Sequence, residues 1–408
     1  MDFIAFSRLR LATLLIGLTI IASSPSSRAI TLTSIQNATS YSFTLTNVTL
    51  SNSSCTPSCI PSLAPNAIQL FHFLSSTSYI IFDYDILSST KKIGSISIKA
   101  SPSSVNIVNG LGATIISTAS TAQIKFTPPS LMWKGSFSSA TSWRSNNWNV
   151  STSLPSWGSS NIQVKTTLDS PKQTNYLRIL YPKGSANPGA SPPLPLGGTQ
   201  FYGSVINTIG PITLSYYIRF PVDFPFLRSS TSTLGTLGKL PGLYSGTGNT
   251  GDNIPTGKDG WTIRFMWCDY ARETGTKLVA GGEIAQFTYQ SDKGLYSSSK
   301  GKFIGCGTWK FVPDGKWHNI QQTIRLNDPG IANGRIDVCY DNKLVYTVKN
   351  VMFRTVDSLK INGIIFQSFF GGSGSEYATP TSTYADFADF AIYSYPASAP
   401  PGLCVTGI

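Results

Sequence analysis

Two neighbouring segments carry the residues of this chain that are best suited to chemistry: Lys239–Tyr244, KLPGLY, and Gly260–Trp267, GWTIRFMW. The proline and glycine of the first segment predict a turn that presents Lys239. The second segment reads as a strand, in which Thr262 and Arg264 share one face because side chains alternate. Arg264 stands among bulky apolar residues, and burying its charge is costly without an anionic partner. The pattern therefore indicates a cleft that binds an anion.

Several familiar chemistries lack their residues in this sequence. Glycoside hydrolysis needs two carboxylates across the scissile bond, but Glu occurs only three times, and Asp386 and Asp389 are three apart, so they would face opposite ways on a strand. The chain has only two histidines, His72 and His318, which leaves few residues from which a catalytic triad or a zinc site could be built. Residues 246–251, GTGNTG, match a dinucleotide fingerprint by letters, but no helical pattern follows. We therefore expect neither a cofactor nor a metal.

One reaction that needs neither a carboxylate pair nor a metal is β-elimination on a polyuronate. The enzyme neutralises the sugar carboxylate so that the proton at C5 becomes acidic, removes that proton, and returns one to the leaving O4. Arg, Lys, Gln and His can neutralise the carboxylate, and Tyr or Lys can transfer the protons. Those residue types are the ones that this chain offers.

The elements that must position these residues are strands. From Leu131 onward all eight Trp occur, Gly and Pro punctuate short apolar runs, and no helical periodicity of useful length appears. Many strands separated by turn residues favour an all-β sandwich of the jelly-roll type. The expected strands are Leu177–Tyr181, Ile212–Phe220, Gly260–Trp267, Ile284–Tyr289, His318–Leu326, Arg335–Tyr340, Lys343–Val348, Ile361–Phe370 and Tyr384–Tyr393. The Pro-rich stretch Asn187–Leu196 is expected to be an exposed loop.

The first third of the chain differs in character. Residues 1–29 read as a secretory signal, because Arg8 and Arg10 precede an apolar run that is too short to cross a bilayer. Residues 30–130 are rich in Ser and Thr with short alternating stretches, which predicts a smaller β module of unknown role; the second domain is then 131–408. Four Asn-x-Ser/Thr sites and an even number of cysteines, six, fit a secreted, extracellular glycoprotein with disulfides, whose pairing stays open.

The charge balance indicates the partner. Lys and Arg number 31 against 19 Asp and Glu, which gives a net charge of +12, yet only 12% of residues are charged. A basic, weakly charged secreted protein suits a polyanion. The cationic residues are scattered rather than in runs, so nucleic acid is disfavoured and an acidic polysaccharide is the expected partner. We expect no membrane association after signal removal, and the oligomeric state is left open.

Residues from about 131 to 396 resemble polysaccharide lyase family 14, the alginate and glucuronan lyase group. Several segments in order carry the resemblance: LRILYPKG (177–184), GTQFYG (198–203), GKLPGLY (238–244), GWTIRFMW (260–267), DGKWHNIQQTIRLN (314–327), ANGRIDV (332–338) and NGIIFQSFFGG (362–372). The resemblance implies a β-jelly roll and a lyase that acts on acidic polysaccharides. It does not extend to residues 30–130.

The resemblance also implies roles for particular residues. The Lys of the KLPGL segment is catalytic in that family, which maps to Lys239. Arg264 and Thr262 would bind the substrate carboxylate and nearby hydroxyls. His318 and Gln321 lie in the matching WHNIQQ segment, but they face opposite sides of a strand, so at most one of them would line the groove.

The chain departs from the family where a Tyr-x-Tyr pair usually follows a Gly-Glu. Counting from Glu283 places Ala285 and Phe287 at the tyrosine positions, and sliding by two places Phe287 and Tyr289 there. Tyr289 is therefore the candidate for the second catalytic residue. Cys268 also stands where the family commonly has Arg.

Three functions compete on this sequence. The first is a secreted lyase in which Lys239 and Tyr289 move protons. The second is a catalytically impaired lyase-like protein that binds acidic glycans, which the incomplete tyrosine pair favours. The third is a structural wall protein in which residues 30–130 are the working part, with Ser/Thr richness as its only support.

Overall fold

The computed structural model describes the chain in two compact units, Met1–Pro129 with Tyr395–Ile408, and Ser130–Ser394. This division differs from the expected boundary at 130 in placing residues 395–408 with the first unit. The described residues are 14–19, 30–36, 42–51, 53–56, 62–63, 68–73, 79–88, 91–101, 104–110, 113–117, 121–126, 129–137, 142–166, 175–189, 194–226, 238–250, 253–268, 280–289, 302–372, 374–395, 401–402 and 404–405.

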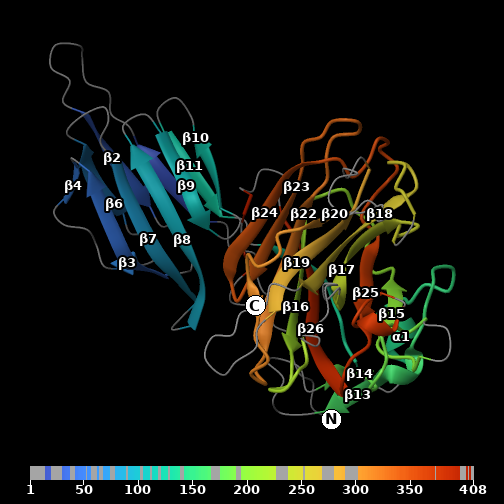
Figure 1. Ribbon diagram of the computed structural model, residues 1–408. Helices are drawn as coiled ribbons and strands as arrows, with labels where there is room; N and C mark the ends of the chain where they lie inside the picture. Colours follow the sequence, from blue (N-terminus) through green and yellow to red (C-terminus); the bar gives the residue numbers. More distant parts are fainter. Residues whose placement is uncertain are drawn as a thin grey trace, which may run out of the picture. The chain divides into compact units, whose positions relative to one another are not determined.

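The first unit is built of antiparallel strands (Figure 1). One sheet has the order β5-β3-β7-β8-β9, a second β2-β6-β4 and a third β1-β11-β10. Strand β1 lies inside the segment expected to be a signal, and that expectation stays a prediction. The bounds are β1 Leu14–Thr19, β2 Ile30–Gln36, β3 Ser42–Ser51, β4 Ser53–Thr56, β5 Ser62–Leu63, β6 Ile68–Phe73, β7 Tyr79–Ser88, β8 Lys91–Ser101, β9 Ser104–Gly110, β10 Ala113–Ser117 and β11 Thr121–Phe126.

The second unit contains two antiparallel sheets. The eight-stranded sheet runs β13-β14-β26-β16-β22-β23-β24, with β12 also paired to β26. Its bounds are β12 Ser130–Lys134, β13 Ile162–Thr166, β14 Asn175–Tyr181, β16 Ile212–Arg219, β22 His318–Arg325, β23 Gly334–Tyr340, β24 Lys343–Val351 and β26 Thr383–Ser394.

The seven-stranded sheet runs β15-β25-β17-β18-β19-β20, with β21 paired to β19. Its bounds are β15 Thr199–Gly203, β17 Gly238–Gly246, β18 Gly260–Cys268, β19 Ala280–Phe287, β20 Lys302–Ile304, β21 Lys310–Phe311 and β25 Gly363–Ser368. Helix is limited, among the described residues, to α1 Trp143–Asn146 and the 3₁₀ turns η1 Ser159–Asn161 and η2 Ser375–Tyr377.

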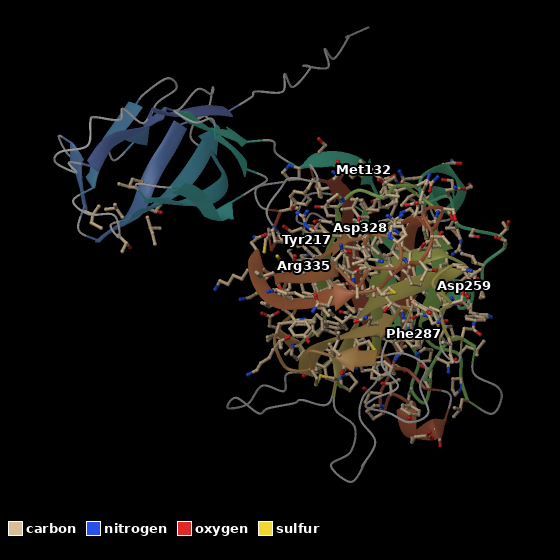
Figure 2. The ribbon with its side chains drawn as sticks, turned by 90° about the horizontal axis from the view of Figure 1, so that it is seen from above. Met132, Tyr217, Asp259, Phe287, Asp328 and Arg335 are labelled. Carbon is tan, nitrogen blue, oxygen red and sulfur yellow. A yellow bond between two sulfur atoms is a disulfide. The ribbon has the colours of Figure 1, made fainter. Side chains whose placement is uncertain are left out.

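The two sheets of the second unit face each other across one hydrophobic core (Figure 2). Alternation along the strands sends one set of side chains inward, as with Leu177, Ile179 and Tyr181 of β14, which are at most 1% exposed. Aromatic rings join the layers: Tyr216 of the eight-stranded sheet contacts Phe265 of the seven-stranded sheet at 6.3 Å between centroids. The predicted all-β sandwich is confirmed.

Strand β17 corrects one local expectation. The KLPGLY segment, expected to be a turn, is part of β17, and the register with β18 shifts between Lys239 and Gly242. Proline inside a sheet is typical of such a bulge, because the bulge frees a residue from the ladder hydrogen bonds. The Pro-Gly pair thus marks an irregular strand here rather than a chain reversal.

A buried carboxylate ties three strands of the eight-stranded sheet together. Asp386 of β26 is fully buried, and it accepts hydrogen bonds from Arg178 Nε at 2.8 Å and Arg219 Nη2 at 2.9 Å. Further along β26 the residues Asp389 and Phe390 oppose the single residue Tyr216, and Asp389 has a φ of 52°. This bulge breaks the simple alternation that the sequence argument assumed for the two aspartates.

One disulfide ties strands of the seven-stranded sheet: Cys268 ends β18 and bonds Cys306, which follows β20. Cys339 and Cys404 are disulfide-bonded as well, so disulfides are confirmed. The side chains of Cys55 and Cys59 lie outside the described residues. Among the described helices, none has the length and apolar character needed to cross a membrane.

The Asp386 cluster gives a stability prediction. Asp386→Ala leaves two partly buried guanidinium groups without their carboxylate, so we expect the free energy of unfolding to fall by about 3 kcal/mol. Urea unfolding followed by tryptophan fluorescence would measure the loss. Asp357→Ala, at an exposed carboxylate, is the control and should cost less than about 0.5 kcal/mol. Equal stability of the two variants would contradict the assignment.

Candidate active site

Lys239 lies on β17 directly before the β-bulge of that strand. Its backbone N–H donates to Phe369 O at 2.8 Å, and in register it lies opposite Met266 of β18. The bulge that follows is supported from behind by the other sheet, where Tyr216 Oη donates to Pro241 O at 3.2 Å. The Gln322 Oε1 atom accepts from Leu243 N at 3.0 Å. Two core side chains thus complete the backbone hydrogen bonding that the bulge leaves open.

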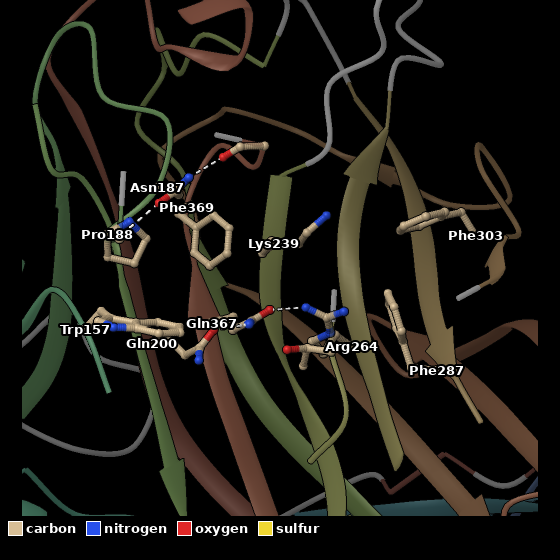
Figure 3. Close-up of a pocket in the computed structure, with 13 residues that line it drawn as sticks. Trp157, Asn187, Pro188, Gln200, Lys239, Arg264, Phe287, Phe303, Gln367 and Phe369 are labelled. Atoms are coloured by element: carbon tan, nitrogen blue, oxygen red, sulfur yellow. Dashed lines mark hydrogen bonds between the residues drawn. The ribbon is translucent and has the colours of Figure 1, made fainter. Parts of the chain in front are cut away.

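A cleft of about 550 Å³ opens on the seven-stranded sheet beside Lys239 (Figure 3). Lys239, Arg264 and Gln367 lie between Trp157 at one end of the cleft and Phe287 and Phe303 at the other. A concave, largely apolar pocket with a few convergent polar groups is the usual form of a ligand site. Its lining residues are Trp157, Asn187, Pro188, Gly189, Gln200, Lys239, Thr250, Arg264, Phe287, Phe303, Gln367, Phe369 and Gly372.

Arg264 is fixed by a chain of side-chain hydrogen bonds across the sheet. Its Nη1 donates to Gln367 Oε1, and Gln367 Nε2 donates in turn to Gln200 Oε1. The strand between them, β17, carries Gly242 opposite Arg264. A Cβ at Gly242 would stand 1.9 Å from Ile263 O, so the close approach of the two strands beneath the guanidinium requires glycine. The guanidinium therefore has one preferred place in the cleft.

The surroundings of Arg264 suit an anion. The side chain is 3% exposed, and its Nε has no hydrogen-bond partner among the described residues. The Phe287 ring lies 4.7 Å from the guanidinium carbon. Burial lowers the pKa of Arg264 to about 10, so the group stays charged at neutral pH. Arg264 lines the cleft, and a carboxylate there would pair with its guanidinium through a charge-assisted hydrogen bond.

Lys239 has an apolar environment that disfavours its charge. Its Nζ lies 3.5 Å from Met266 Sδ and 5.4 Å from the centroid of the Phe303 ring. Burial lowers the pKa of Lys239 well below 10.5, the positive charge of Arg264 lowers it further, and Glu283 partly offsets both effects. A lysine of lowered pKa can take up a proton near neutral pH, which suits a general base. The half-buried position also corrects the expectation of a freely exposed loop lysine.

Of the other residues expected near the site, Thr262 bonds to the backbone of the segment that leads into the cleft lining. It is fully buried, and its Oγ1 donates to Asn249 O at 2.7 Å, next to the lining residue Thr250. Its hydroxyl is therefore engaged with the backbone, and direct contact with a substrate stays a prediction.

The structure places Phe287, rather than Tyr289, in the cleft. Ala285 and Phe287 lie opposite Arg264 and Thr262 in register, which matches the count from Glu283. Tyr289 follows the end of β19, and its Cγ would lie 3.0 Å from a Cβ at Gly257, outside the described lining residues. A catalytic role for Tyr289 stays a prediction.

His318 and Gln321 lie on the eight-stranded sheet, away from the described lining of the cleft. His318 contacts two carboxylates, with Nδ1 2.8 Å from Asp341 Oδ2 and Nε2 3.3 Å from Asp314 Oδ1. Gln321 is 1% exposed and its Nε2 donates to Asn319 Oδ1 at 2.7 Å. The geometry gives both residues structural partners and brings neither to Lys239, so their substrate roles stay predictions.

Sequence reasoning missed several lining residues. Gln200 and Gln367 are polar residues within otherwise apolar strand segments, GTQFYG and NGIIFQSFFGG, and that exception was the available signal. Asn187 and Pro188 begin the stretch expected to be an exposed loop, yet Pro188 is buried and both line the cleft. Among the described residues, no group of three His, Cys, Asp or Glu side chains is placed to hold a metal.

A family comparison decides the identity of the second unit. The model of the family "Polysaccharide lyase 14" matches residues 169–390, which is more than half of the chain. This chain belongs to polysaccharide lyase family 14. No curated protein sequence matches it.

Solved structures of similar fold include lyases. The polysaccharide lyase 14 alginate lyase from Aplysia kurodai is 24% identical, with 65% of this chain and 99% of that chain covered and a TM-score of 0.49. The alginate lyase vAL-1 from Chlorella virus is 20% identical, over 61% and 93%, at 0.45. The endo-β-1,4-glucuronan lyase from Trichoderma reesei is 11% identical, over 64% and 96%, at 0.39.

The placement of His318 predicts a pH-dependent stability. Its hydrogen bond to Asp341 is the first cause that raises the pKa of His318 above 6.5. Its contribution to stability is therefore complete below 6.5 and is lost as pH rises through the higher folded pKa. We expect His318→Gln to cost about 1 kcal/mol near pH 5 and much less near pH 9, measured by urea unfolding at both. An equal loss at the two pH values would contradict this role.

Proposed function

We propose that this protein is a secreted lyase that cleaves a uronate polysaccharide by β-elimination. The observation that carries the proposal is that one cleft contains both a charged arginine, Arg264, and a lysine, Lys239, whose pKa is lowered by burial. Family membership gives the reaction class. Secretion is supported by the disulfides and by the signal that residues 1–29 predict.

In this mechanism the guanidinium of Arg264, which lines the cleft, binds the uronate carboxylate. As the C5–H bond weakens, negative charge moves onto the carboxylate oxygens, and a fixed guanidinium stabilises it more in the transition state than in the ground state. The Gln367 and Gln200 side chains hold the guanidinium in place, so little reorganisation is needed during the reaction.

Lys239 moves the protons. Its neutral amine takes the proton from C5, the C5–H electrons form the C4–C5 double bond, and the C4–O4 bond breaks. The ammonium then returns the proton to O4, which leaves the amine neutral again. Positioned lysines of lowered pKa are suited to both steps, because the same group is a competent base and then a competent acid.

The direct experiment is ultraviolet absorbance during incubation with alginate, polymannuronate, polyguluronate and glucuronan. β-Elimination creates a conjugated C4–C5 double bond, whereas hydrolysis and binding create none. We expect a rising signal on at least one polymer, which would also name the uronate. A flat trace on all four, from folded protein, would refute lyase activity on these substrates.

A glycan-binding protein without turnover is the second candidate. It is favoured by Ala285 and Phe287, which lie opposite Arg264 and Thr262 and, counted from Glu283, stand where the family resemblance implies a tyrosine pair. Binding of one of the four polymers, weakened by salt as charge pairing requires, together with a flat absorbance trace would identify this function.

Removal of the Lys239 amine should abolish cleavage. We expect Lys239→Met to lower kcat at least about a hundredfold, the usual contribution of a general base, without loss of stability, because the apolar environment disfavours the charge. In the wild type, kcat should rise with pH through a midpoint well below 10.5, as Lys239 loses its proton. Lys258→Met, at an exposed lysine, is the control. Near-normal cleavage by folded Lys239→Met would refute the role.

The proton-transfer role that the sequence predicts for Tyr289 can be tested by one substitution. If Lys239 alone moves the protons, Tyr289→Phe keeps kcat within about threefold of wild type, a change of under 1 kcal/mol in the barrier, because Tyr289 packs beside Gly257 outside the described lining. A loss of a hundredfold or more would show instead that the Tyr289 hydroxyl takes part in proton transfer.

A further inference from the structure

Trp157 is the only exposed residue among the eight tryptophans, all of which the structure describes. Its exposed fraction is 47%, whereas Trp143, Trp148, Trp261 and Trp267 are fully buried. A single exposed apolar residue is ordinary on a protein surface. Trp157 differs because it lines the cleft at the end opposite Phe287 and Phe303 (Figure 3).

The backbone of Trp157 is anchored although its ring is open to solvent. It pairs with Gln200 of β15 through two hydrogen bonds, Trp157 N to Gln200 O at 2.9 Å and Gln200 N to Trp157 O at 3.0 Å. Thr199 Oγ1 also donates to Trp157 O, at 2.9 Å. The next residue, Gly158, has a φ of 71°, and a Cβ there would stand 2.2 Å from Gly198 O. An aromatic ring on so firmly held a backbone binds without much loss of conformational entropy.

The glutamines between Trp157 and Arg264 are both engaged in hydrogen bonds within the protein. Gln367 accepts from Arg264 and donates to Gln200. Gln200 accepts that bond, and its Nε2 donates to Pro155 O at 3.3 Å.

The two basic residues of the lining, Lys239 and Arg264, lie away from Trp157. Asn187 is also engaged, because its Nδ2 donates to Gly372 O and its Oδ1 accepts from Gly189 N at 2.8 Å. At this far end the indole of Trp157 is the large exposed apolar surface.

The spacing of the sheet separates the two ends. Trp157, β15, β25 and β17 follow one another by backbone pairing, so the backbones of Trp157 and Lys239 are three strand spacings, or about 14 Å, apart. A sugar ring that places its carboxylate at Arg264 and its C5 at Lys239 cannot also cover Trp157. A ring further along the same chain can reach it.

We propose that Trp157 is a sugar-stacking platform at the far end of the cleft, which binds a ring of the uronate chain beyond the one held at Arg264. The inference rests on the proposed function in taking a uronate chain as the ligand. The C–H face of a pyranose packs on the indole while its hydroxyls and carboxylate stay in water, which suits an amphipathic aromatic at a wet site. The platform makes the protein favour longer chains over short ones.

Binding of defined oligosaccharides tests the platform. The full chain carrying Lys239→Met, which prevents cleavage, is titrated calorimetrically with the trisaccharide and the hexasaccharide of mannuronate, guluronate and glucuronate. We expect Trp157→Ala to weaken hexasaccharide binding about tenfold and to leave the trisaccharide within about twofold. Trp157→Phe should restore most of the loss. Leu344→Ala, at an exposed residue of β24, is the control and should change neither.

A second readout follows the ring itself. Because the other tryptophans are buried or half-buried, acrylamide should quench Trp157 preferentially, and bound hexasaccharide should protect it. Equal weakening of both lengths in Trp157→Ala, no weakening, or no binding of any oligosaccharide by the parent would overturn the proposal. Protection of Trp157 by hexasaccharide in a wild type that yields no unsaturated product would uphold the platform and refute the lyase.

Discussion

The bulge in β17 is the constraint on which the cleft depends. On a regular strand Lys239 and Gly242, three residues apart, would face opposite sides of the sheet. The register shift between them adds one residue to β17, and Lys239 lines the same cleft as Arg264. The bulge is stable because the facing sheet completes its hydrogen bonding through Tyr216 and Gln322. The position of the reactive amine therefore depends on the packing of the sandwich core.

The electrostatics of the cleft follow from the same arrangement. Burial disfavours the charges of Lys239 and Arg264, and the charge of Arg264 makes that of Lys239 still more costly. The lysine can relieve this cost by giving up its proton, whereas the arginine keeps its charge, and its Nε has no hydrogen-bond partner among the described residues. The site thus combines a fixed cation, which can neutralise a carboxylate, with a titratable base, which can remove a proton. β-Elimination needs both functions.

Much of the fold could be predicted from the sequence, because alternation and turn residues are local signals. The strands at 212–220, 260–267 and 318–326 end within a residue or two of the observed ones. The bulge at Leu240–Pro241 could not be predicted, since Pro-Gly serves both turns and bulges, and only the hydrogen bonds from Tyr216 and Gln322 decide between them.

The site was predictable where a charged residue interrupts an apolar pattern, as with Arg264, or where the family resemblance reached it, as with Lys239. Gln200, Gln367 and Trp157 come from strands and loops far apart in sequence, and their convergence depends on sheet order, which local patterns do not encode. His318 shows the converse: a residue type suited to chemistry whose partners, Asp314 and Asp341, give it a structural place.

The central claim is that the pKa of Lys239 lies far below that of an ordinary lysine, because the amine is buried and because it lies beside the charge of Arg264. Competitive labelling of amines across a pH series, with Lys239 and the exposed Lys258 quantified by mass spectrometry in the same sample, measures this directly. The account predicts a midpoint for Lys239 well below 10.5, and a rise of that midpoint when Arg264→Gln removes the neighbouring charge. A midpoint for Lys239 that coincides with that of Lys258 would contradict the account.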